Sequence, residues 1–366
     1  MSYKSKIYTA IGLMSGTSLD GVDAAVIYSD GLTKIDYGPA ITIDYNSSFR
    51  KNLRSIIGQK HYNGKILSIE SELTDYHIYA VNKLIEDNSL NNEELDIISF
   101  HGQTISHDPS NQHTFQIGDP IKLSKYTKIN VINDFRSADI NAGGQGAPLV
   151  PIFHSACLKN ELLPLVVVNI GGVSNVTWIG ANESIISFDT GPGNALLNDW
   201  VYKKKGQFFD KDGEFSRVGL VKMEIVDKVM ESNFFCLAPP KSLDRQFFNH
   251  DIIPTNLSLE DGAATAVDLI CKSIISSKTH FPIKPNKWLI TGGGSKNLSI
   301  MDSLKKLIGN EVYKIESVGL NSDFLEAQAF AYLGIRSLNS LPITFPETTG
   351  CKKPTLGGVL TKHSLI

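Results

Sequence analysis

The sequence predicts a two-lobed α/β protein in which one structural pattern occurs twice. Its 366 residues suggest two domains rather than one. In each half, two apolar segments flank a glycine-containing turn, and further strands and helices follow. The halves share this pattern but little residue identity. We therefore expect a duplicated fold with lobe one formed by residues 1–135 and about 340–366, and lobe two formed by residues 136–340.

The first half begins with two apolar segments, residues 7–13 and 24–28, on either side of a turn rich in Gly, Ser, Thr and Asp. This pattern predicts a β-hairpin. Between residues 65 and 85, apolar side chains recur every three or four positions, which predicts an amphipathic helix. Residues 95–100 and 128–132 are expected to be short buried strands that end at polar residues.

The second half follows a glycine-rich junction at residues 142–147. Two expected strands again flank a tight turn, here Gly171-Gly172, and a third ends at Asp189. The expected strands are residues 165–170, 173–179, 184–188 and 288–290, and the expected helices are residues 262–277, about 295–307 and about 323–336.

The composition limits the classes of partner. Lys and Arg number 35 and Asp and Glu number 38, and the one basic run, residues 203–205, is short enough to be a solvated helix end. A nucleic-acid partner is therefore not expected. The four cysteines are scattered without a CxxC pair, so a structural zinc site is not expected, and this fits a reducing compartment. The longest apolar run, residues 162–168, is too short to span a membrane, so we expect a cytoplasmic protein.

The turn of the first hairpin has the composition of a phosphate-binding loop. It reads Gly16-Thr17-Ser18-Leu19-Asp20-Gly21 and is followed by Val22 and Asp23. Glycine lets the main chain approach an anion closely, and hydroxyl and N–H groups can donate to phosphate oxygens. The lysine of a Walker A loop is missing. An ordinary hairpin turn remains an alternative at this point.

Two further glycine turns repeat this feature. Gly171-Gly172 lies in the second hairpin, and Gly292-Gly293-Gly294 joins a strand to a helix, where bare main chain and a helix N-terminus could receive a flat ligand. A Rossmann dinucleotide site is excluded because no G-x-G-x-x-G follows the first strand. Three such turns are typical of the nucleotide cleft of the actin and hexokinase superfamily, where two loops clasp the phosphates and the third carries the adenosine.

Several carboxylates are candidates for chemistry. Asp189 stands at the end of an apolar strand beside a glycine-rich loop, a suitable place for a general base, and helix capping explains it poorly because the next helix starts near Asn194. Glu326 lies in the first turn of its helix, where the macrodipole alone could explain a negative charge. Asp20 and Asp23 could hold magnesium through water or stabilise the turn.

A group of polar residues follows the strands of the first half. His101 comes at the end of one expected strand, and Asp134 and Arg136 follow another. These groups suit sugar hydroxyls, and Arg136 suits a carboxylate, although a structural salt bridge between Asp134 and Arg136 is an equal alternative. The G-x-S-x-G of a serine hydrolase is absent, and no histidine pair indicates a transition metal.

Long motifs in the chain resemble those of the 1,6-anhydro-N-acetylmuramic acid kinase family, within the actin/hexokinase-like (ribonuclease H-like) sugar kinases. The resemblance extends from about residue 9 to the glycine-rich segment near Gly358. The matching motifs are GLMSGTSLDGVD at residues 12–23, FHGQT at 100–104, QIGD at 116–119, GGQGAPLVP at 143–151, NIGGVSN at 169–175 and FDTGPGN at 188–194.

The resemblance implies a reaction and a role for each motif. Members of this family convert 1,6-anhydro-N-acetylmuramic acid, ATP and water into N-acetylmuramic acid 6-phosphate and ADP, in cell-wall recycling. Asp189 matches the general base for the water, Glu326 matches a second active-site carboxylate, and residues 16–23 match the ATP-binding stretch in a central nucleotide cleft. We assign the sugar to His101, Asp134, Arg136, Gln145 and Asn194. Mg²⁺ is expected to arrive with ATP rather than at a protein metal site, and a homodimer is expected.

One segment departs from the family pattern. Where the family has Pro-Lys-Ser-Thr-Gly-Arg-Glu, this chain has Pro-Lys-Ser-Leu-Asp-Arg-Gln at residues 240–246, which puts the local backbone geometry and any role of this loop in doubt. Two other functions remain open at this point: a kinase that phosphorylates a hydroxyl of another amino sugar, and an ATP-binding sensor on the same fold without catalysis.

Overall fold

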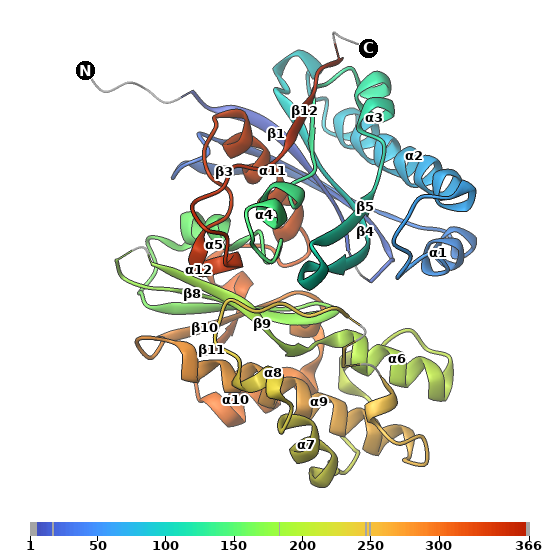
Figure 1. Cartoon of the computed structure of the whole chain (residues 1–366), viewed down its shortest axis with the longest axis vertical. Helices are drawn as coiled ribbons and strands as arrows, with labels where there is room; N and C mark the ends of the chain where they lie inside the picture. The colour runs from blue at the N-terminus through green and yellow to red at the C-terminus, as the bar shows by residue number, and fades with distance from the viewer. Residues whose placement is uncertain (1–5, 17, 183, 246, 249, 364–366) are drawn as a thin grey trace. The chain divides into compact units, whose positions relative to one another are not determined.

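The computed structural model describes residues 6–363, apart from residues 17, 183, 246 and 249. The chain divides into two compact units (Figure 1). Unit 1 comprises Met1–Leu158 and Asp323–Ile366, and unit 2 comprises Lys159–Ser322. The chain therefore enters unit 2 once and returns once to complete unit 1.

The division between the units differs from the predicted one, which fell at residue 135 and near residue 340. The segments 136–158 and 323–339 belong to unit 1. The reason lies in helix α11 (Leu325–Leu338), which packs on strand β1 (Tyr8–Ser15) so closely that a Cβ on Gly12 would overlap the main-chain oxygen of Ala327. Glycine at this position thus lets a helix from late in the chain lie directly on the first strand.

The described residues of unit 1 form a seven-stranded mixed sheet in the order β12-β6-β4-β1-β2-β3, with β5 paired to β4. Strands β1, β2 and β3 form an antiparallel meander, whereas β4 is parallel to β1 and β6 is parallel to β4. The strands other than β1 are β2 (Gly21–Ser29), β3 (Ile35–Asp44), β4 (Ile97–Asp108), β5 (His113–Ile117), β6 (Val131–Asn133) and β12 (Val359–Thr361).

Unit 2 repeats this strand arrangement. Among its described residues, a five-stranded sheet has the order β11-β10-β7-β8-β9. Strands β7, β8 and β9 form the antiparallel meander, β10 is parallel to β7, and β11 is parallel to β10. The strands are β7 (Leu165–Ile170), β8 (Val173–Ile179), β9 (Ile185–Pro192), β10 (Lys287–Thr291) and β11 (Val312–Lys314). The shared strand order confirms the predicted duplicated α/β fold.

The helices cover these sheets and bury one apolar core in each unit. Those of unit 1, besides α11, are α1 (Ser47–Arg54), α2 (Gly64–Asp87), α3 (Pro120–Thr127), α4 (Ser137–Asn141), α5 (Pro151–Leu158) and α12 (Pro346–Thr349). Those of unit 2 are α6 (Asn194–Lys205), α7 (Met223–Met230), α8 (Asn233–Cys236), α9 (Leu259–Ser276) and α10 (Leu298–Ile308). In unit 1, α2 contributes Ile66, Ile69 and Leu73 to the core, which confirms the predicted amphipathic helix.

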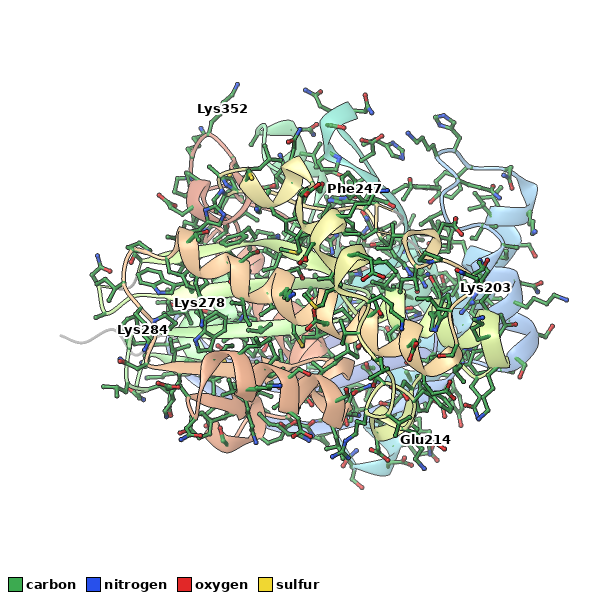
Figure 2. The ribbon with its side chains drawn as sticks, turned by 90° about the horizontal axis from the view of Figure 1, so that it is seen from below. Lys203, Glu214, Phe247, Lys278, Lys284 and Lys352 are labelled. Carbon is green, nitrogen blue, oxygen red and sulfur yellow. The ribbon has the colours of Figure 1, made fainter. Side chains whose placement is uncertain are left out.

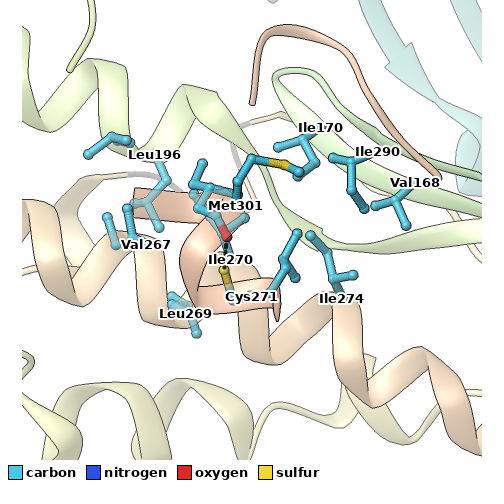
Figure 3. Packing of buried hydrophobic residues seen from close by; sticks show 14 of the residues in the cluster. Val168, Ile170, Leu196, Val267, Leu269, Ile270, Cys271, Ile274, Ile290 and Met301 are labelled. Carbon is cyan, nitrogen blue, oxygen red and sulfur yellow. Dashed lines mark hydrogen bonds between the residues drawn. The ribbon is translucent and has the colours of Figure 1, made fainter. Parts of the chain in front are cut away.

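The core of unit 2 is built from β-branched strand residues and aliphatic helix residues. Val168 on β7 and Ile290 on β10 pack against Ile270 and Ile274 of α9, and Met301 of α10 closes one side (Figure 3). All five side chains are at most 4% exposed. This packing makes the sheet and α9 one rigid scaffold, from which the loops at the ends of β7, β9 and β10 project.

Most predicted elements are confirmed, and the differences have physical causes. The basic run at residues 203–205 is an exposed helix end, as predicted, with Lys203 among the outer side chains of Figure 2. Strand β4 continues past Phe100 to Asp108 because β5 supplies a partner for its main chain. Within the described part of the chain, no helix combines the length and the hydropathy needed to cross a bilayer.

Candidate active site

The first glycine turn of unit 1 joins β1 to β2. The N–H of Leu19 donates to the main-chain oxygen of Gly16 at 3.2 Å, and Leu19 has a positive φ of 56°. Ser18 and Asp20 are exposed, and the Ser18 hydroxyl donates to the Asp20 carboxylate at 2.5 Å. Gly16 thus begins a tight turn that leaves polar groups at the surface. Thr17 lies outside the described residues.

The other predicted members of this segment contribute differently. Leu19 and Val22 are buried, so only their main chains are available to a ligand. Gly21 begins β2 and is paired with Asp44 of β3. The nucleotide prediction for this segment therefore concerns main-chain groups and the polar side chains of Ser18, Asp20 and Asp23.

Residues that were not predicted as site residues fix the start of this turn. Gln103, fully buried on β4, accepts a hydrogen bond from the Ser15 hydroxyl at 2.6 Å and donates from Nε2 to the Gly16 oxygen at 3.3 Å. The Tyr45 hydroxyl lies 2.7 Å from Ser15 Oγ. A polar residue inside a buried strand could have indicated Gln103, but this strand was predicted to end at residue 100. These bonds fix the start of the turn to the sheet.

Four carboxylates of unit 1 influence one another near this turn. Asp23 is half-buried on β2 and accepts a hydrogen bond from Thr42 Oγ1 at 2.6 Å. Burial raises the pKa of Asp23 to about 7, and the charges of Asp20, Glu326 and Asp323 raise it further against the effect of that hydrogen bond. Glu326 lies in the first turn of α11, as predicted. The group creates a region of negative potential that favours a bound cation.

His101 and Arg136 meet in unit 1. His101 is buried in the middle of β4 rather than at a strand end, because β4 is longer than predicted. Arg136 donates to His101 Nε2 from Nη2 at 2.9 Å and from Nε at 3.2 Å, and it donates from Nη1 to the Gly146 oxygen at 2.6 Å. Burial, followed by the Arg136 charge, holds the pKa of His101 well below its usual value. A neutral imidazole therefore orients the guanidinium.

Asp134 and Gln145 lie beside this pair in the chain. Asp134 has a positive φ of 55°, which is uncommon for a residue with a side chain, and its carboxylate accepts the N–H of Ser137 at 3.1 Å. The N–H of Gln145 donates to the oxygen of Thr349 at 2.6 Å. The contacts of Arg136 with His101 and Gly146 fix the position of its guanidinium. A non-glycine residue held in this conformation is often part of a functional site.

Asp189 of unit 2 is 7% exposed and lies within β9, which continues to Pro192 instead of ending at Asp189 as predicted. The segment after α8 holds it at two points. The Asp189 N–H donates to the oxygen of Lys241 at 2.9 Å, and the N–H of Leu243 donates to Asp189 Oδ2 at 2.7 Å. The loop that departs from the family pattern thus contacts Asp189 through its main chain, which does not depend on the side chain at residue 243.

Lys241 anchors that loop. Its side chain is buried, and Nζ donates to the oxygen of Phe234 at 3.0 Å and to that of Phe235 at 3.4 Å. Burial lowers the pKa of Lys241. The ammonium also lies 4.6 Å from the centre of the Phe234 ring. Lys241 was not predicted as a site residue, and its place in the family motif was its only signal in the sequence.

The two glycine turns of unit 2 converge around Asn194. The N–H of Asn194 donates to the Gly171 oxygen at 2.7 Å, and its side-chain Nδ2 donates to the Ile170 oxygen at 3.0 Å. A Cβ on Gly293 would lie 3.1 Å from Asn194 Nδ2. The turn after β7 and the turn after β10 are therefore neighbours at one edge of the sheet, as expected for the carboxyl ends of adjacent parallel strands.

The turn after β10 differs from the prediction in one respect. Residues Gly293–Lys296 form a 3₁₀ turn, and α10 begins only at Leu298, where the Asn297 side chain already accepts the N–H groups of Ser299 and Ile300. The end of α10 is therefore capped by the chain itself and is not directly available to a ligand at the glycines. Gly292 has a φ of 76°, and a Cβ there would overlap the Asn169 side chain, so this position needs glycine.

The structure thus assembles the predicted residues in two groups. Asp20, Asp23 and Glu326 influence one another in unit 1, where His101, Arg136 and the turn at Gln145 also lie together. In unit 2, Asn194 joins Gly171 to Gly293, and Asp189 lies on β9, the strand that ends just before Asn194. Among the described residues, no cluster of three or more His, Cys, Asp or Glu side chains is arranged to hold a metal ion.

A small pocket of unit 2 lies elsewhere. It has a volume of about 180 Å³ and is lined by Lys278, Lys284 and Trp288, among others; Figure 2 labels the two lysines. It contains none of the predicted site residues. This pocket is therefore not the predicted active site.

Comparison with known proteins decides the family. The family model described as anhydro-N-acetylmuramic acid kinase matches residues 8–363. The chain belongs to the anhydro-N-acetylmuramic acid kinase family. It is 42% identical to the enzyme of that name from Paramagnetospirillum magneticum over 352 residues, which cover 95% of this chain and 98% of the relative. It is also 42% identical to the one from Zymomonas mobilis over 359 residues, with 95% and 98% covered. The family predicted from the motifs, and with it the class of sugar kinase, is confirmed.

Solved structures match this chain only at low sequence identity. The activator of 2-hydroxyisocaproyl-CoA dehydratase from Clostridium difficile with bound ADPNP is 13% identical, with a TM-score of 0.46, and the match covers 91% of this chain and 96% of the activator.

Proposed function

We propose that this chain uses ATP and water to open 1,6-anhydro-N-acetylmuramic acid and to phosphorylate O6, giving N-acetylmuramic acid 6-phosphate and ADP for cell-wall recycling. The observation that carries the proposal is the environment of Asp189. A buried carboxylate on the strand next to β8, held by a main-chain N–H at 2.7 Å, has a fixed position and a defined orientation. These are the requirements for a general base.

Asp189 takes the proton in the proposed reaction. The water oxygen bonds to the anomeric carbon, the bond from that carbon to O6 breaks, and the water proton passes to Asp189. O6 bonds to the γ-phosphorus, and the bond from that phosphorus to the β–γ bridging oxygen breaks to release ADP. Glu326 is the second active-site carboxylate of the proposal, and its place in the first turn of α11 orients it. Positioning supplies much of the rate in reactions of this kind.

ATP is the proposed nucleotide, and Mg²⁺ accompanies it. We assign the phosphates to residues 16–23 of unit 1 and to Gly171 and Gly172, and the adenosine to Gly292–Gly294, where bare main chain is available. Asp20 and Asp23 fit the ion, because Mg²⁺ in such enzymes is usually held by one or two carboxylates together with phosphate oxygens. When bound, Mg²⁺ neutralises charge on the phosphates. The residues of the chain orient the nucleotide around it.

The sugar is assigned to His101, Asp134, Arg136, Gln145 and Asn194. Arg136, oriented by the neutral His101, suits the lactyl carboxylate of muramic acid. Asn194 lies between the glycine turns, where it could donate to a sugar or phosphate oxygen. On the family resemblance alone, we also propose a cytoplasmic homodimer, which light scattering after size-exclusion chromatography would test.

A coupled ADP-release assay tests the function. The chain should release ADP with 1,6-anhydro-N-acetylmuramic acid and much less with N-acetylmuramic acid or N-acetylglucosamine. In ¹⁸O-labelled water, the product should carry label at the anomeric carbon. An unlabelled product would exclude hydrolytic opening, and ATP binding without ADP release would favour a sensor.

The Asp189→Asn variant tests the base. It keeps an oxygen that can accept the Leu243 N–H but cannot take up a proton. Turnover should fall by about 10²- to 10⁴-fold, while ATP binding measured by calorimetry stays unchanged. Turnover at the wild-type rate would show that Asp189 is not the base.

A further inference from the structure

Asn175 shares the face of the unit 2 sheet on which Asp189 lies. Along β8 and β9, Val176 and Phe188 are cross-strand partners, and both belong to the hydrophobic core. Side chains alternate between the two faces of a strand. The preceding pair, Asn175 and Asp189, therefore points away from that core, with the two side chains adjacent on one face.

A β-bulge fixes this pair. Ser174 is paired with Gly191 and Asn175 with Asp189, so Thr190 is an extra residue on β9. The Thr190 hydroxyl donates to the Ser174 oxygen at 3.1 Å, which holds the bulge. Bulges next to active sites often redirect a side chain. Here the bulge lies directly beside Asp189.

The Asn175 side chain has an unused acceptor. Its Oδ1 is buried and has no hydrogen-bond partner among the residues that the structure describes. The next pair on the same face, Thr177 and Ser187, contrasts with it: the two hydroxyls lie 3.2 Å apart, and Ser187 Oγ donates to the Val176 oxygen at 2.6 Å. Buried acceptors without partners are rare because they lose hydration without compensation.

We propose that Asn175 is a further catalytic residue, which accepts a hydrogen bond from the attacking water. This inference rests on the proposed function. A water molecule has two protons: Asp189 removes one as the bond to the anomeric carbon forms, and Asn175 Oδ1 accepts a hydrogen bond from the other, which stays on the new anomeric hydroxyl. Two acceptors on one face fix both O–H directions and so point a lone pair at the sugar. One acceptor leaves the water free to rotate.

Replacement of Asn175 by Ala gives the first test. We expect kcat to fall on the order of 10²-fold, as for other losses of reactant alignment, with KM for ATP and for the sugar within about twofold of wild type. Because Oδ1 has no described protein partner, the melting temperature should equal or exceed that of wild type. An unchanged kcat, a raised KM alone, or a lower melting temperature would overturn the inference, since the last two indicate a sugar contact and a structural role.

Two further variants complete the test. Thr177→Val removes a hydroxyl one pair along the same face and should leave kcat unchanged; an equal loss there would mean that any change on this face impairs the enzyme and would overturn the inference. Asn175→Asp keeps an acceptor beside Asp189 but adds a like charge. It should therefore shift the acid limb of the kcat–pH profile to higher pH, because neighbouring carboxylates resist joint ionisation. An unshifted profile would place residue 175 away from the base.

The outcomes separate this inference from the proposed function. If the wild-type chain releases no ADP with the anhydro sugar, the proposed function itself is wrong. The alternative outcome is an active wild-type chain, an inactive Asp189→Asn variant and a fully active Asn175→Ala variant. This outcome would support the proposed function and refute only the role of Asn175.

Discussion

Replacement of Asp23 by Asn should change how the stability of the chain depends on pH. Asp23 lies half-buried on β2, accepts the Thr42 hydroxyl, and is surrounded by the charges of Asp20, Asp323 and Glu326. Burial is the main reason that its pKa rises from 3.8 to about 7. Asparagine has nearly the same shape and can accept the same hydrogen bond, but it cannot ionise. The variant therefore isolates the free energy of holding a negative charge at this position.

The magnitude follows from linkage. A raised folded-state pKa means that the folded chain holds this proton more tightly, so the stabilising effect is complete below pH 3.8 and is lost as the pH rises towards 7. A rise of roughly three units corresponds to about 4 kcal/mol. Between pH 5 and pH 8, about 2.5 kcal/mol of this should appear as a growing advantage of Asp23→Asn over wild type.

Urea denaturation in buffer without nucleotide or Mg²⁺ measures the effect. Far-UV circular dichroism follows the whole chain, whereas tryptophan fluorescence reports unit 2 alone, because Trp178, Trp200 and Trp288 all lie there. Hydrogen exchange of β2 reports unit 1. The matched control is Asp44→Asn, which removes an exposed carboxylate from the adjacent strand and should give no such pH dependence. Stabilities of wild type and Asp23→Asn that run parallel from pH 5 to pH 8 would refute a raised pKa of Asp23 in the folded chain.

Two other predictions concern packing and the loop that holds the base. Gly12→Ala should destabilise unit 1 by about 3 kcal/mol or more in urea denaturation, because the new methyl group would overlap the Ala327 oxygen, whereas Gly64→Ala, with open space around it, should be neutral or slightly stabilising. Lys241→Met keeps the length of the side chain but removes the hydrogen bonds of the ammonium, so kcat should fall about tenfold with KM for ATP unchanged, as the loop no longer holds Asp189 firmly. A raised KM for ATP with unchanged kcat would contradict this role.

Local sequence patterns predicted the strands and helices well where packing and pattern agree. The spacing of apolar residues in α2 specified a helix whose core face the structure confirms. The length of β4 could not be predicted, because His101 and Gln103 are polar, and their burial in a strand depends on their partners Arg136 and Ser15 as well as on pairing with β5. Burial of a polar side chain depends on a partner that is distant in sequence.

In the candidate active site too, the sequence predicted which residues matter but not the distant contacts that hold them. The motifs identified Asp189 as a candidate base, but its carboxylate is held by the Leu243 N–H, 54 positions away, in a loop whose side chains differ from the family pattern. A main-chain donor leaves no mark in the sequence. The role of Asn175 Oδ1 could not be predicted from the sequence either, because the β-bulge that pairs Asn175 with Asp189 is a feature of the tertiary structure.

By itself, the amino-acid sequence determined the duplicated α/β class, the family and the identity of the principal candidate residues, because these depend on local periodicity and on long motifs. The tertiary structure alone decided that α11 completes unit 1, that Asn194 joins two glycine turns, and that Asp23 holds its proton near neutral pH. Each of these depends on close approach between segments far apart in the chain, and the free energy of such contacts is set by distance and desolvation rather than by residue order.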